Sequence, residues 1–224
     1  MKKHIVKIKS IEFINYNVLE VVTEKPENYD FEPWQATEIA INLEGCKNEK
    51  RPFTFTNLPR EKDLQFTIKV YPSLNGVTKK LSKLEEGAEL ILGDVFGAIQ
   101  FKGKGVFLAG GAGVTPFIAI FKSLGFQNEM DYNSLIFANK TEKDIFLEQE
   151  FETLLGKRFM NILSEEETQK YPTGHIDRDF LKSIIKDFSQ YFYVCGPPEM
   201  TESVTEDLKS LGVAAEKIVI EDYD

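Results

Sequence analysis

The stretch VFLAGGAGVTPF, residues 106–117, decides the fold. It begins as an apolar run, turns through three closely spaced glycines and continues from Thr115 and Pro116 into an apolar pattern with helical spacing. Proline suits the first turn of a helix, where its missing N–H removes no internal hydrogen bond. The stretch therefore predicts a buried strand, a tight turn and a helix whose free backbone amides can receive a pyrophosphate. An ordinary strand-to-helix turn has similar residues, so the motif alone assigns no ligand.

The same rhythm continues to the end of the chain. Apolar runs alternate with helical patterns, and a last run, KIVIEDY, closes the sequence. This alternation predicts a parallel sheet covered by helices, an α/β arrangement. The expected strands are GVFLAGG (105–111), SLIFANK (134–140), RFMNILS (158–164) and YFYVCGP (191–197). The expected helices are TPFIAIFKSLG (115–125), EKDIFLEQEFETLLG (142–156), DRDFLKSIIKDF (177–188) and EMTESVTEDLKSLG (199–212).

The first hundred residues have a different pattern, with short runs rich in Ile, Val, Phe and Thr between turn residues. They predict a small antiparallel barrel or sandwich, interrupted by one helix at TKKLSKLEEG (78–87) that Gly87 ends. The expected division is an antiparallel β-barrel domain at 1–101 and an α/β domain at 102–224. The expected strands are HIVKIKSIEF (4–13), YNVLEVVTE (16–24), ATEIAINLE (36–44), PFTFTN (52–57), LQFTIKVY (64–71) and AELILGD (88–94).

Composition excludes several classes of function. Acidic residues outnumber basic ones by 36 to 27, which gives a net charge of −9 and argues against nucleic-acid binding. With only Cys46 and Cys195, the chain cannot build a disulfide framework, a zinc ribbon or a four-cysteine iron–sulfur cluster, and we expect no metal site. The N-terminal residues have no apolar signal core, and the uncharged run 105–121 is too short and too broken to span a bilayer. We expect a cytoplasmic protein without membrane insertion.

Three further segments contain candidate site residues. Cys195 ends an apolar strand, and parallel strands present their carboxyl ends to one crevice, although most free cysteines simply pack in a core. In RPFTFTN, Arg51 can bind a phosphate and Phe53 can face a planar ring, yet an ordinary strand has the same pattern. The loop in SLNGVTKKL opens the predicted helix with Gly76 and Thr78, a second place for phosphate.

Taken together and in order, the motifs resemble the ferredoxin-NADP reductase superfamily over essentially the whole chain. The motifs are RPFT, NGVTKKL, GDVFG, AGGAGVTPF, FANKTEKDI, GHID, CGPPEM and a terminal E-x-Y. TIKVY and FANKTEKDI are also similar to the NADH-dependent cytochrome reductases of that superfamily. The resemblance implies a flavin-binding barrel followed by a nicotinamide-dinucleotide-binding α/β domain, with FAD and NAD(P)H as cofactors.

The resemblance also implies roles for individual residues. Cofactor-binding residues in the barrel would be Arg51, Pro52, Phe53, Thr54, Ile68, Lys69, Val70, Gly76, Val77 and Thr78. Those in the α/β domain would be Gly111, Gly113, Thr115, Asn139, Lys140, Cys195, Gly196, Pro197 and Tyr223. The residues at the reacting rings would be Thr54, Cys195, Glu221 and Tyr223, with Tyr223 covering the flavin.

The chain departs from the family pattern at four places. Trp34 replaces the glycine of a Pro-Gly-Gln motif, Val95 stands where proline is usual, and His175 stands where arginine is frequent. Asp224 follows Tyr223, where many relatives end at the aromatic. None of these changes removes a group that hydride transfer needs.

The expected activity is hydride transfer from NAD(P)H to flavin N5, followed by electron transfer to a separate acceptor such as ferredoxin, flavodoxin or a partner redox subunit. The alternatives are a reductase of free flavin or ferric chelates and a flavin- or dinucleotide-binding subunit without turnover. Lys140 can pair with a 2′-phosphate, which favours NADPH, but NADH-type relatives also have a lysine there. The choice between NADH and NADPH and the oligomeric state stay open.

Overall fold

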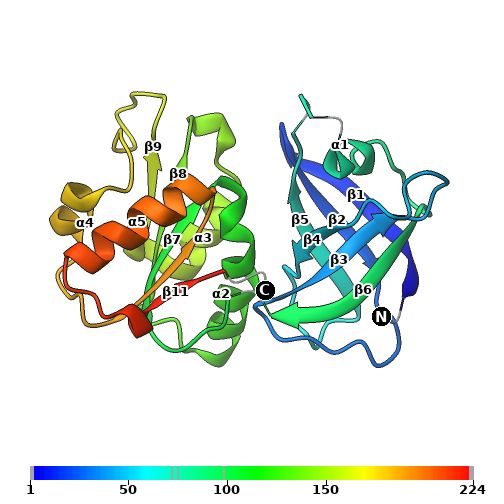
Figure 1. The fold of residues 1–224 in the computed structure, drawn as a ribbon, viewed down its shortest axis with the longest axis horizontal. Helices are drawn as coiled ribbons and strands as arrows, with labels where there is room; N and C mark the ends of the chain where they lie inside the picture. Colours follow the sequence, from blue (N-terminus) through cyan, green and yellow to red (C-terminus); the bar gives the residue numbers. More distant parts are fainter. Residues whose placement is uncertain (1–2, 72, 75, 98, 222–224) are drawn as a thin grey trace.

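The computed structural model describes residues 3–71, 73–74, 76–97 and 99–221 and contains two sheets. In Figure 1 a β-barrel half that includes one short helix lies beside an α/β half, with helix α2 (Thr115–Gln127) on the side of the α/β half that faces the barrel. The two sheets are built from successive parts of the chain, because β6 ends at Gly97 and β7 begins at Gly105. This is the architecture that the change of sequence pattern predicts.

The barrel is a six-stranded antiparallel sheet with the order β4-β3-β6-β1-β2-β5. Its two edge strands meet where Phe55 bridges to Phe66 and the Thr56 N–H donates to the Gln65 carbonyl over 2.8 Å. These contacts close the sheet, so the structure is a barrel and not a sandwich. The strands are β1 (His4–Asn15), β2 (Val18–Glu24), β3 (Gln35–Ile41), β4 (Arg51–Thr54), β5 (Asp63–Lys69) and β6 (Glu89–Gly97).

The helix of the barrel is shorter than the sequence predicts. Helix α1 (Val77–Leu81) has one apolar side, on which Val77 and Leu81 are buried, and it ends well before the expected stop at Gly87. Gly87 instead has φ +86° and donates its N–H to the Ile8 carbonyl over 2.8 Å, in the turn that leads into β6. Glycine is suited to this left-handed turn, so its role is in the turn and not at the end of the helix.

The α/β half is a five-stranded parallel sheet with the order β11-β10-β7-β8-β9. The predicted helix at 142–156 is divided into the short turn η2 and α3, separated by Leu147 at φ +54°. The strands are β7 (Gly105–Gly110), β8 (Ser134–Asn139), β9 (Phe159–Leu163), β10 (Tyr191–Cys195) and β11 (Ile218–Ile220). The helices are α2 (Thr115–Gln127), α3 (Glu148–Leu155), α4 (Arg178–Ile184) and α5 (Pro198–Ser210), with 3₁₀ turns η1 (Gly111–Val114), η2 (Glu142–Asp144), η3 (Gly156–Arg158) and η4 (Ala215–Lys217).

The two faces of the parallel sheet have separate cores because successive side chains of a strand point to opposite faces. Phe107 packs with residues of α2 and α3, whereas its neighbour Leu108 packs with residues of α4 and α5. Phe107 also stacks on Tyr193 of β10, with ring centroids 4.3 Å apart. Both faces of the sheet are thus covered, as the apolar strand patterns predict.

An apolar seam joins the barrel to the α/β half. Val18 of the barrel and Ile99 of the connecting segment are fully buried in the same cluster as Phe107. Trp34 and Phe101 are partly buried and pack against that cluster. The barrel and the connecting segment therefore contribute to one of the two cores of the α/β half, which restrains the relative movement of the halves.

The connecting segment is also held by the hydroxyl group of Tyr193, a fully buried residue. That oxygen accepts hydrogen bonds from the Lys102 and Gly103 amides over 2.9 and 3.0 Å and donates to the Gly103 carbonyl over 2.5 Å. Burial raises the pKa of Tyr193 to about 12, so the hydroxyl keeps its proton at neutral pH. One side chain of β10 thus fixes the path of the chain between the two sheets.

We predict that Tyr193→Phe lowers the free energy of unfolding by about 1–3 kcal/mol, because it removes the hydroxyl group of a fully buried side chain that forms three hydrogen bonds to the connecting segment. Urea denaturation followed by circular dichroism measures the change. Tyr132→Phe is the matched control, since Tyr132 is 73% exposed and should change stability by less than about 0.5 kcal/mol. Equal stability of the two variants would show that the hydroxyl of Tyr193 does not secure the connecting segment.

Candidate functional site

One cleft of about 980 Å³ lies between the barrel and the α/β half. Its barrel wall comes from β4, β5 and the residues that follow β5, and its opposite wall comes from the carboxyl ends of β7, β8, β9 and β10. The structure brings fifteen of the predicted site residues to this cleft. They are Pro52, Phe53, Thr54, Ile68, Lys69, Thr78, Gly111, Gly113, Thr115, Asn139, Lys140, Cys195, Gly196, Pro197 and Glu221.

Five predicted site residues are not among those lining the cleft. Arg51 is exposed at the start of β4 and donates from a guanidinium nitrogen to the Lys50 carbonyl over 2.7 Å. Val70 and Val77 pack in the barrel core, so only their backbone is available to a ligand. Gly76 precedes α1 with open space around it, and Tyr223 lies outside the described residues. The binding roles assigned to these residues stay predictions.

Two loops meet at the centre of the α/β wall, and the glycines allow that contact. A Cβ on Gly113 would lie 2.2 Å from the Cys195 carbonyl oxygen, and one on Gly110 would lie 2.4 Å from the sulfur of Met200. Gly111 has φ +52°, and a Cβ there would lie 3.7 Å from Lys69 Nζ of the barrel. A side chain at Gly110 or Gly113 would therefore collide with the segment that follows β10, which packs against the loop after β7. Gly111 has the left-handed backbone that turns the chain toward the cleft.

Cys195 lies at this junction as a protonated thiol. Its sulfur donates to Glu221 Oε2 over 3.2 Å. Burial raises the pKa of Cys195 well above its usual value, and the charge and hydrogen bond of Glu221 raise it further. A buried neutral thiol is a poor nucleophile, so this cysteine contributes a small apolar surface and orients the carboxylate of Glu221.

Phe53, Thr54 and Tyr71 belong to the barrel wall. Thr54 is buried, Phe53 is half-buried, and Tyr71 remains exposed along the edge of the cleft. Apolar rings beside a hydroxyl group can bind a flat heteroaromatic ring by stacking and a directed hydrogen bond. Tyr71 is absent from the predicted set, although its place at the end of the apolar run LQFTIKVY could have indicated it.

Lys69 places a positive charge between the two walls. Its ammonium nitrogen lies 3.6 Å from Asp144 Oδ1, which also accepts a hydrogen bond from the Tyr16 hydroxyl over 2.5 Å. Burial alone would raise the pKa of Asp144, but hydrogen bonds from Tyr16 and Thr141 and the charge of Lys69 bring it below its usual value. The ionised Asp144 therefore holds Lys69 at the cleft, 3.7 Å from the position of a Cβ on Gly111.

The far end of the cleft lies beyond β8 and β9. Asn139 is buried there, and neither polar atom of its side chain has a partner in the described part of the protein. Lys140 forms an ion pair of 2.6 Å with Glu165, and both side chains are exposed. Ser164, Glu165, Gly174 and His175 line the cleft here but, apart from the departure noted at His175, are absent from the predicted set. Ser164 and Glu165 directly follow the third strand, β9, and Gly174 and His175 belong to the GHID motif; these were the signals that could have found them.

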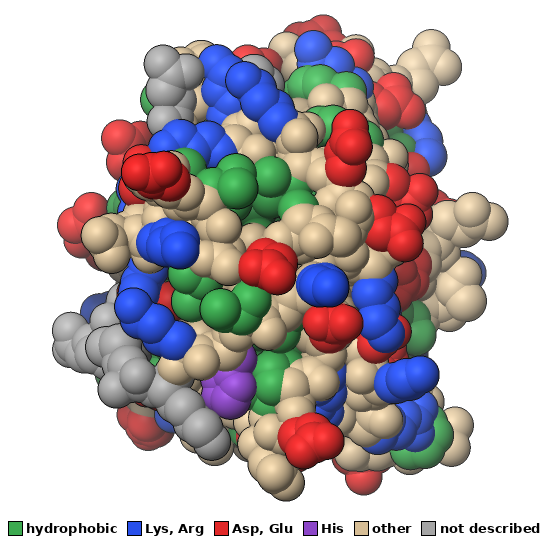
Figure 2. Space-filling model, turned by 90° about the vertical axis from the view of Figure 1, so that its right-hand side faces the viewer, with side chains coloured by type: hydrophobic (Ala, Val, Ile, Leu, Met, Phe, Trp, Pro, Cys, Tyr) green, Lys and Arg blue, Asp and Glu red, His purple; other side chains and the backbone are tan. Residues whose placement is uncertain are grey.

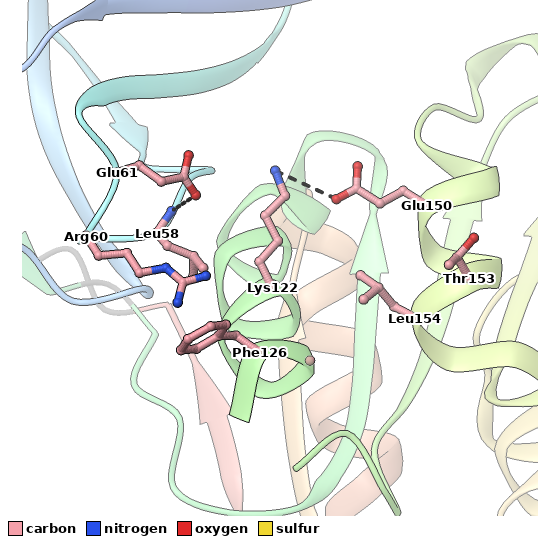
Figure 3. A pocket seen from close by; sticks show the side chains of 9 residues that line it. Leu58, Arg60, Glu61, Lys122, Phe126, Glu150, Thr153 and Leu154 are labelled. Atoms are coloured by element: carbon pink, nitrogen blue, oxygen red, sulfur yellow. Dashed lines mark hydrogen bonds and ion pairs between the residues drawn. The ribbon is translucent and has the colours of Figure 1, made fainter. Parts of the chain in front are cut away.

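A second, open hollow lies between the barrel loop 58–61 and helices α2 and α3 (Figure 3). The Arg60 guanidinium lies over the ring of Phe126, 3.2 Å from its centroid. Lys122 donates to the Thr56 carbonyl over 3.0 Å and lies 3.7 Å from Glu150 Oε1. The contacts of Arg60 with Phe126 and of Lys122 with Thr56 run from the barrel to the α/β half, so they support the arrangement of the two halves, whereas the Lys122–Glu150 pair joins α2 to α3.

On the face of the barrel shown in Figure 2, basic and acidic side chains are interspersed. Within residues 3–71, 73–74, 76–97 and 99–221, no three His, Cys, Asp or Glu side chains are placed to hold a metal ion. No helix in the same ranges is both long and apolar enough to cross a bilayer.

The comparisons with known proteins all match NAD(P)-dependent oxidoreductases. Residues 107–206 match the oxidoreductase NAD-binding domain. The chain is 27% identical to NADH-cytochrome b5 reductase 2 of Botryotinia fuckeliana over 89% of this chain and 63% of that protein. It is 29% identical to the F component of the Na⁺-translocating NADH-quinone reductase of Yersinia pestis, over 62% of this chain and 38% of that component. The chain thus spans less than two thirds of the length of these relatives.

A solved structure has the same fold over nearly the whole chain. The ferredoxin NADP⁺ reductase of Neisseria gonorrhoeae, with bound FAD and NADP, superposes with a TM-score of 0.84 over 97% of both chains. The two sequences are 18% identical, so the likeness is one of architecture. It confirms the predicted barrel followed by an α/β half.

We predict that Cys195 in the folded protein reacts with iodoacetamide at pH 8 at least about tenfold more slowly than in urea, because it is buried and protonated. Peptide mass spectrometry over time measures the rate. Cys46 in the same sample is the internal control, since it is only partly buried. Equal alkylation of Cys195 in the folded and unfolded states would contradict the description of an enclosed neutral thiol.

Proposed function

Because residues 107–206 match an oxidoreductase NAD-binding domain and the motifs of the chain resemble those of the ferredoxin-NADP reductase superfamily, we propose that it is an FAD-dependent NAD(P)H oxidoreductase. Residues 1–101 would bind the flavin and residues 102–224 the dinucleotide. One observation carries the proposal: a single cleft joins Thr54 on the barrel to Cys195 and Glu221 beyond the parallel sheet. Two ring systems bound from the two walls would meet in this cleft.

The residues of the cleft fit both cofactors. The barrel wall offers Phe53 and Tyr71 for stacking and the Thr54 hydroxyl for a hydrogen bond to a ring edge. The opposite wall offers the backbone amides that begin η1 and α2, which suit a pyrophosphate. The amide group of the buried Asn139, which has no hydrogen-bond partner among the residues that the structure describes, supports a ligand there, because buried polar groups without partners are costly.

A bound flavin would supply N5 as the acceptor of a hydride from nicotinamide C4 and could then pass the two electrons on singly. The protein's own contribution is orientation and exclusion of water. The buried Cys195 closes the base of the site, and its hydrogen bond fixes the carboxylate of Glu221. Lys69, restrained by Asp144, places positive charge where diphosphate oxygens would approach.

We propose that the electrons leave to a separate redox acceptor. The names of the relatives point to cytochrome or quinone partners, and ferredoxin or flavodoxin stay candidates. Reduction of free flavin or ferric chelates would use the same cleft, so a panel of acceptors distinguishes these activities. A cytoplasmic location and the place of Tyr223 over the flavin are also proposals.

The decisive experiment is stopped-flow reduction of the purified protein by NADH and NADPH. Loss of flavin absorbance near 450 nm on mixing with either dinucleotide is the expected result, at a rate on the order of 1–1000 per second. Acceptors are then tested on the reduced protein. Absence of flavin reduction by both dinucleotides would overturn the proposed function.

We predict that the protein binds FAD in preference to FMN, because Arg51 and the loop from Gly76 to Thr78 are available for a diphosphate. The flavin is released by heat from a sample first saturated with an equal mixture of FAD and FMN and then identified by chromatography. Recovery of FMN alone, or of no flavin from the folded protein, would reject the assignment.

We predict that Thr54→Ala slows flavin reduction by roughly five- to hundredfold, because one hydrogen bond in a desolvated site is worth about 1–3 kcal/mol. Stopped-flow rates at saturating dinucleotide measure the loss. The matched control is Thr23→Ala, which removes a buried threonine hydroxyl of β2 that does not line the cleft. A rate for Thr54→Ala within a factor of two of the control would place Thr54 away from the reacting centre.

A further inference from the structure

We propose that Tyr16 is a positioning residue: its hydroxyl group occupies the Asp144 oxygen that would otherwise bind Lys69, and so keeps the Lys69 ammonium free for the diphosphate of the dinucleotide. The inference rests on the proposed function, since Lys69 lines the cleft in which the dinucleotide would bind. Tyr16 itself is 55% exposed in the turn between β1 and β2 and does not line that cleft. Its effect on the ligand therefore passes through Asp144.

The turn that contains Tyr16 joins the barrel to η2 of the α/β half. The Tyr16 hydroxyl donates to Asp144 Oδ1 over 2.5 Å, and the side-chain amide of Asn15 donates to the Lys143 carbonyl over 3.1 Å. The hydrogen bond to Asp144, followed by burial, raises the pKa of Tyr16 to about 12. The hydroxyl is therefore a permanent donor at neutral pH, and it points at a carboxylate that is almost fully buried.

Both oxygens of Asp144 already accept hydrogen bonds from neutral groups. Oδ1 accepts from Tyr16, and Oδ2 accepts from the hydroxyl and the N–H of Thr141 over 2.7 and 3.2 Å. Lys69 Nζ lies 3.6 Å from Oδ1, which is too long for a hydrogen bond. In the part of the chain that the structure describes, that ammonium has no other polar partner. Asp144 thus attracts Lys69 by charge without using one of its donors.

The Lys69 ammonium therefore keeps all three of its N–H donors for a ligand. Its side chain is only 15% exposed, and its nitrogen would lie 3.7 Å from a Cβ on Gly111, at the turn where η1 begins. The backbone amides that begin η1 and α2 suit a pyrophosphate at the same place. A lysine bonded directly to Asp144 would be drawn away from this turn and would have one donor fewer.

Removal of the Tyr16 hydroxyl would produce that bonded lysine. In Tyr16→Phe, Oδ1 of the buried Asp144 loses its donor, and a buried charged oxygen without a donor is costly. The ammonium of Lys69 is 3.6 Å away and can close to about 2.8 Å, the usual length of a charge-assisted hydrogen bond. A diphosphate would then have to compete with Asp144 for the same ammonium.

The test compares the parent protein, loaded with flavin, with Tyr16→Phe and Asn15→Ala. The second variant is the matched control, because Asn15 donates from the same turn to the Lys143 and Ile145 carbonyls and makes no bond to Asp144. Calorimetry measures binding of ADP-ribose, which contains the diphosphate but no nicotinamide. Stopped-flow reduction separates the Kd of the dinucleotide from the limiting rate. Crystal structures of the parent and of Tyr16→Phe locate the Lys69 nitrogen.

We expect Tyr16→Phe to weaken binding of ADP-ribose and of the dinucleotide by about three- to tenfold, as for the loss of one charge-assisted hydrogen bond. The limiting rate of flavin reduction should change less than about twofold, because the substitution acts on binding and not on the reacting rings. Asn15→Ala should change each value less than about twofold. In the crystal structure of Tyr16→Phe, Lys69 Nζ should lie about 2.8 Å from Asp144 Oδ1.

A double-mutant cycle tests whether Tyr16 acts through Lys69. Lys69→Met removes the ammonium and should itself weaken ADP-ribose binding. Tyr16→Phe added to Lys69→Met should then cause less than about a twofold further loss, since residues that act through one contact are not additive. Additive losses in the double variant, or equal losses of affinity in Tyr16→Phe and Asn15→Ala, would overturn the role of Tyr16.

Failure of the proposed function has a different signature. In that case neither dinucleotide reduces the flavin and ADP-ribose does not bind to the parent. The crystal structures then decide the inference: movement of Lys69 onto Asp144 in Tyr16→Phe supports the positioning role of the hydroxyl, and an unmoved Lys69 contradicts it.

Discussion

The apolar seam between the barrel and the parallel sheet is the contact on which the rest of the structure depends. Val18 and Ile99 are buried in the same core as Phe107, so neither half encloses that core alone. Burial of apolar surface contributes most of the favourable free energy of such a contact, but it does not fix the orientation of one half relative to the other. The seam brings Thr54 and Cys195 to opposite walls of one cleft.

Polar contacts around the seam fix the relative orientation of the two halves, which apolar packing alone does not. The Tyr16 hydroxyl bonds to Asp144, Lys122 bonds to the Thr56 carbonyl, and Tyr193 holds the connecting segment. The first two contacts join the barrel to the α/β half, and the third joins the α/β half to the chain between them. A hydrogen bond requires distance and angle together, so a few of them define the relative orientation of the halves. The site is thereby preorganised for two cofactors that must meet within contact distance.

The lysines of the cleft show why charge has to be interpreted in three dimensions. In the sequence, Lys69 is a candidate cofactor-binding residue and Lys140 is a candidate for pairing with a 2′-phosphate. In the structure Lys69 lies 3.6 Å from a buried carboxylate and Lys140 lies 2.6 Å from an exposed one. Their partners, Asp144 and Glu165, are distant in the sequence, and the surroundings of each pair decide what charge a ligand meets. Lys69 stays beside the glycine turn, whereas Lys140 is offset by an acidic run.

The sequence by itself determined the features that depend on neighbouring residues. Alternation of apolar residues identified the strands, and the glycine turn with Pro116 located the main helix start, because both report local backbone geometry and burial. Only the tertiary structure decided that the first sheet closes through Phe55 and Phe66, that α1 ends at Leu81, and that Glu165 pairs with Lys140. These outcomes depend on which segments meet in space, and no local pattern contains the distance between residues that are far apart along the chain.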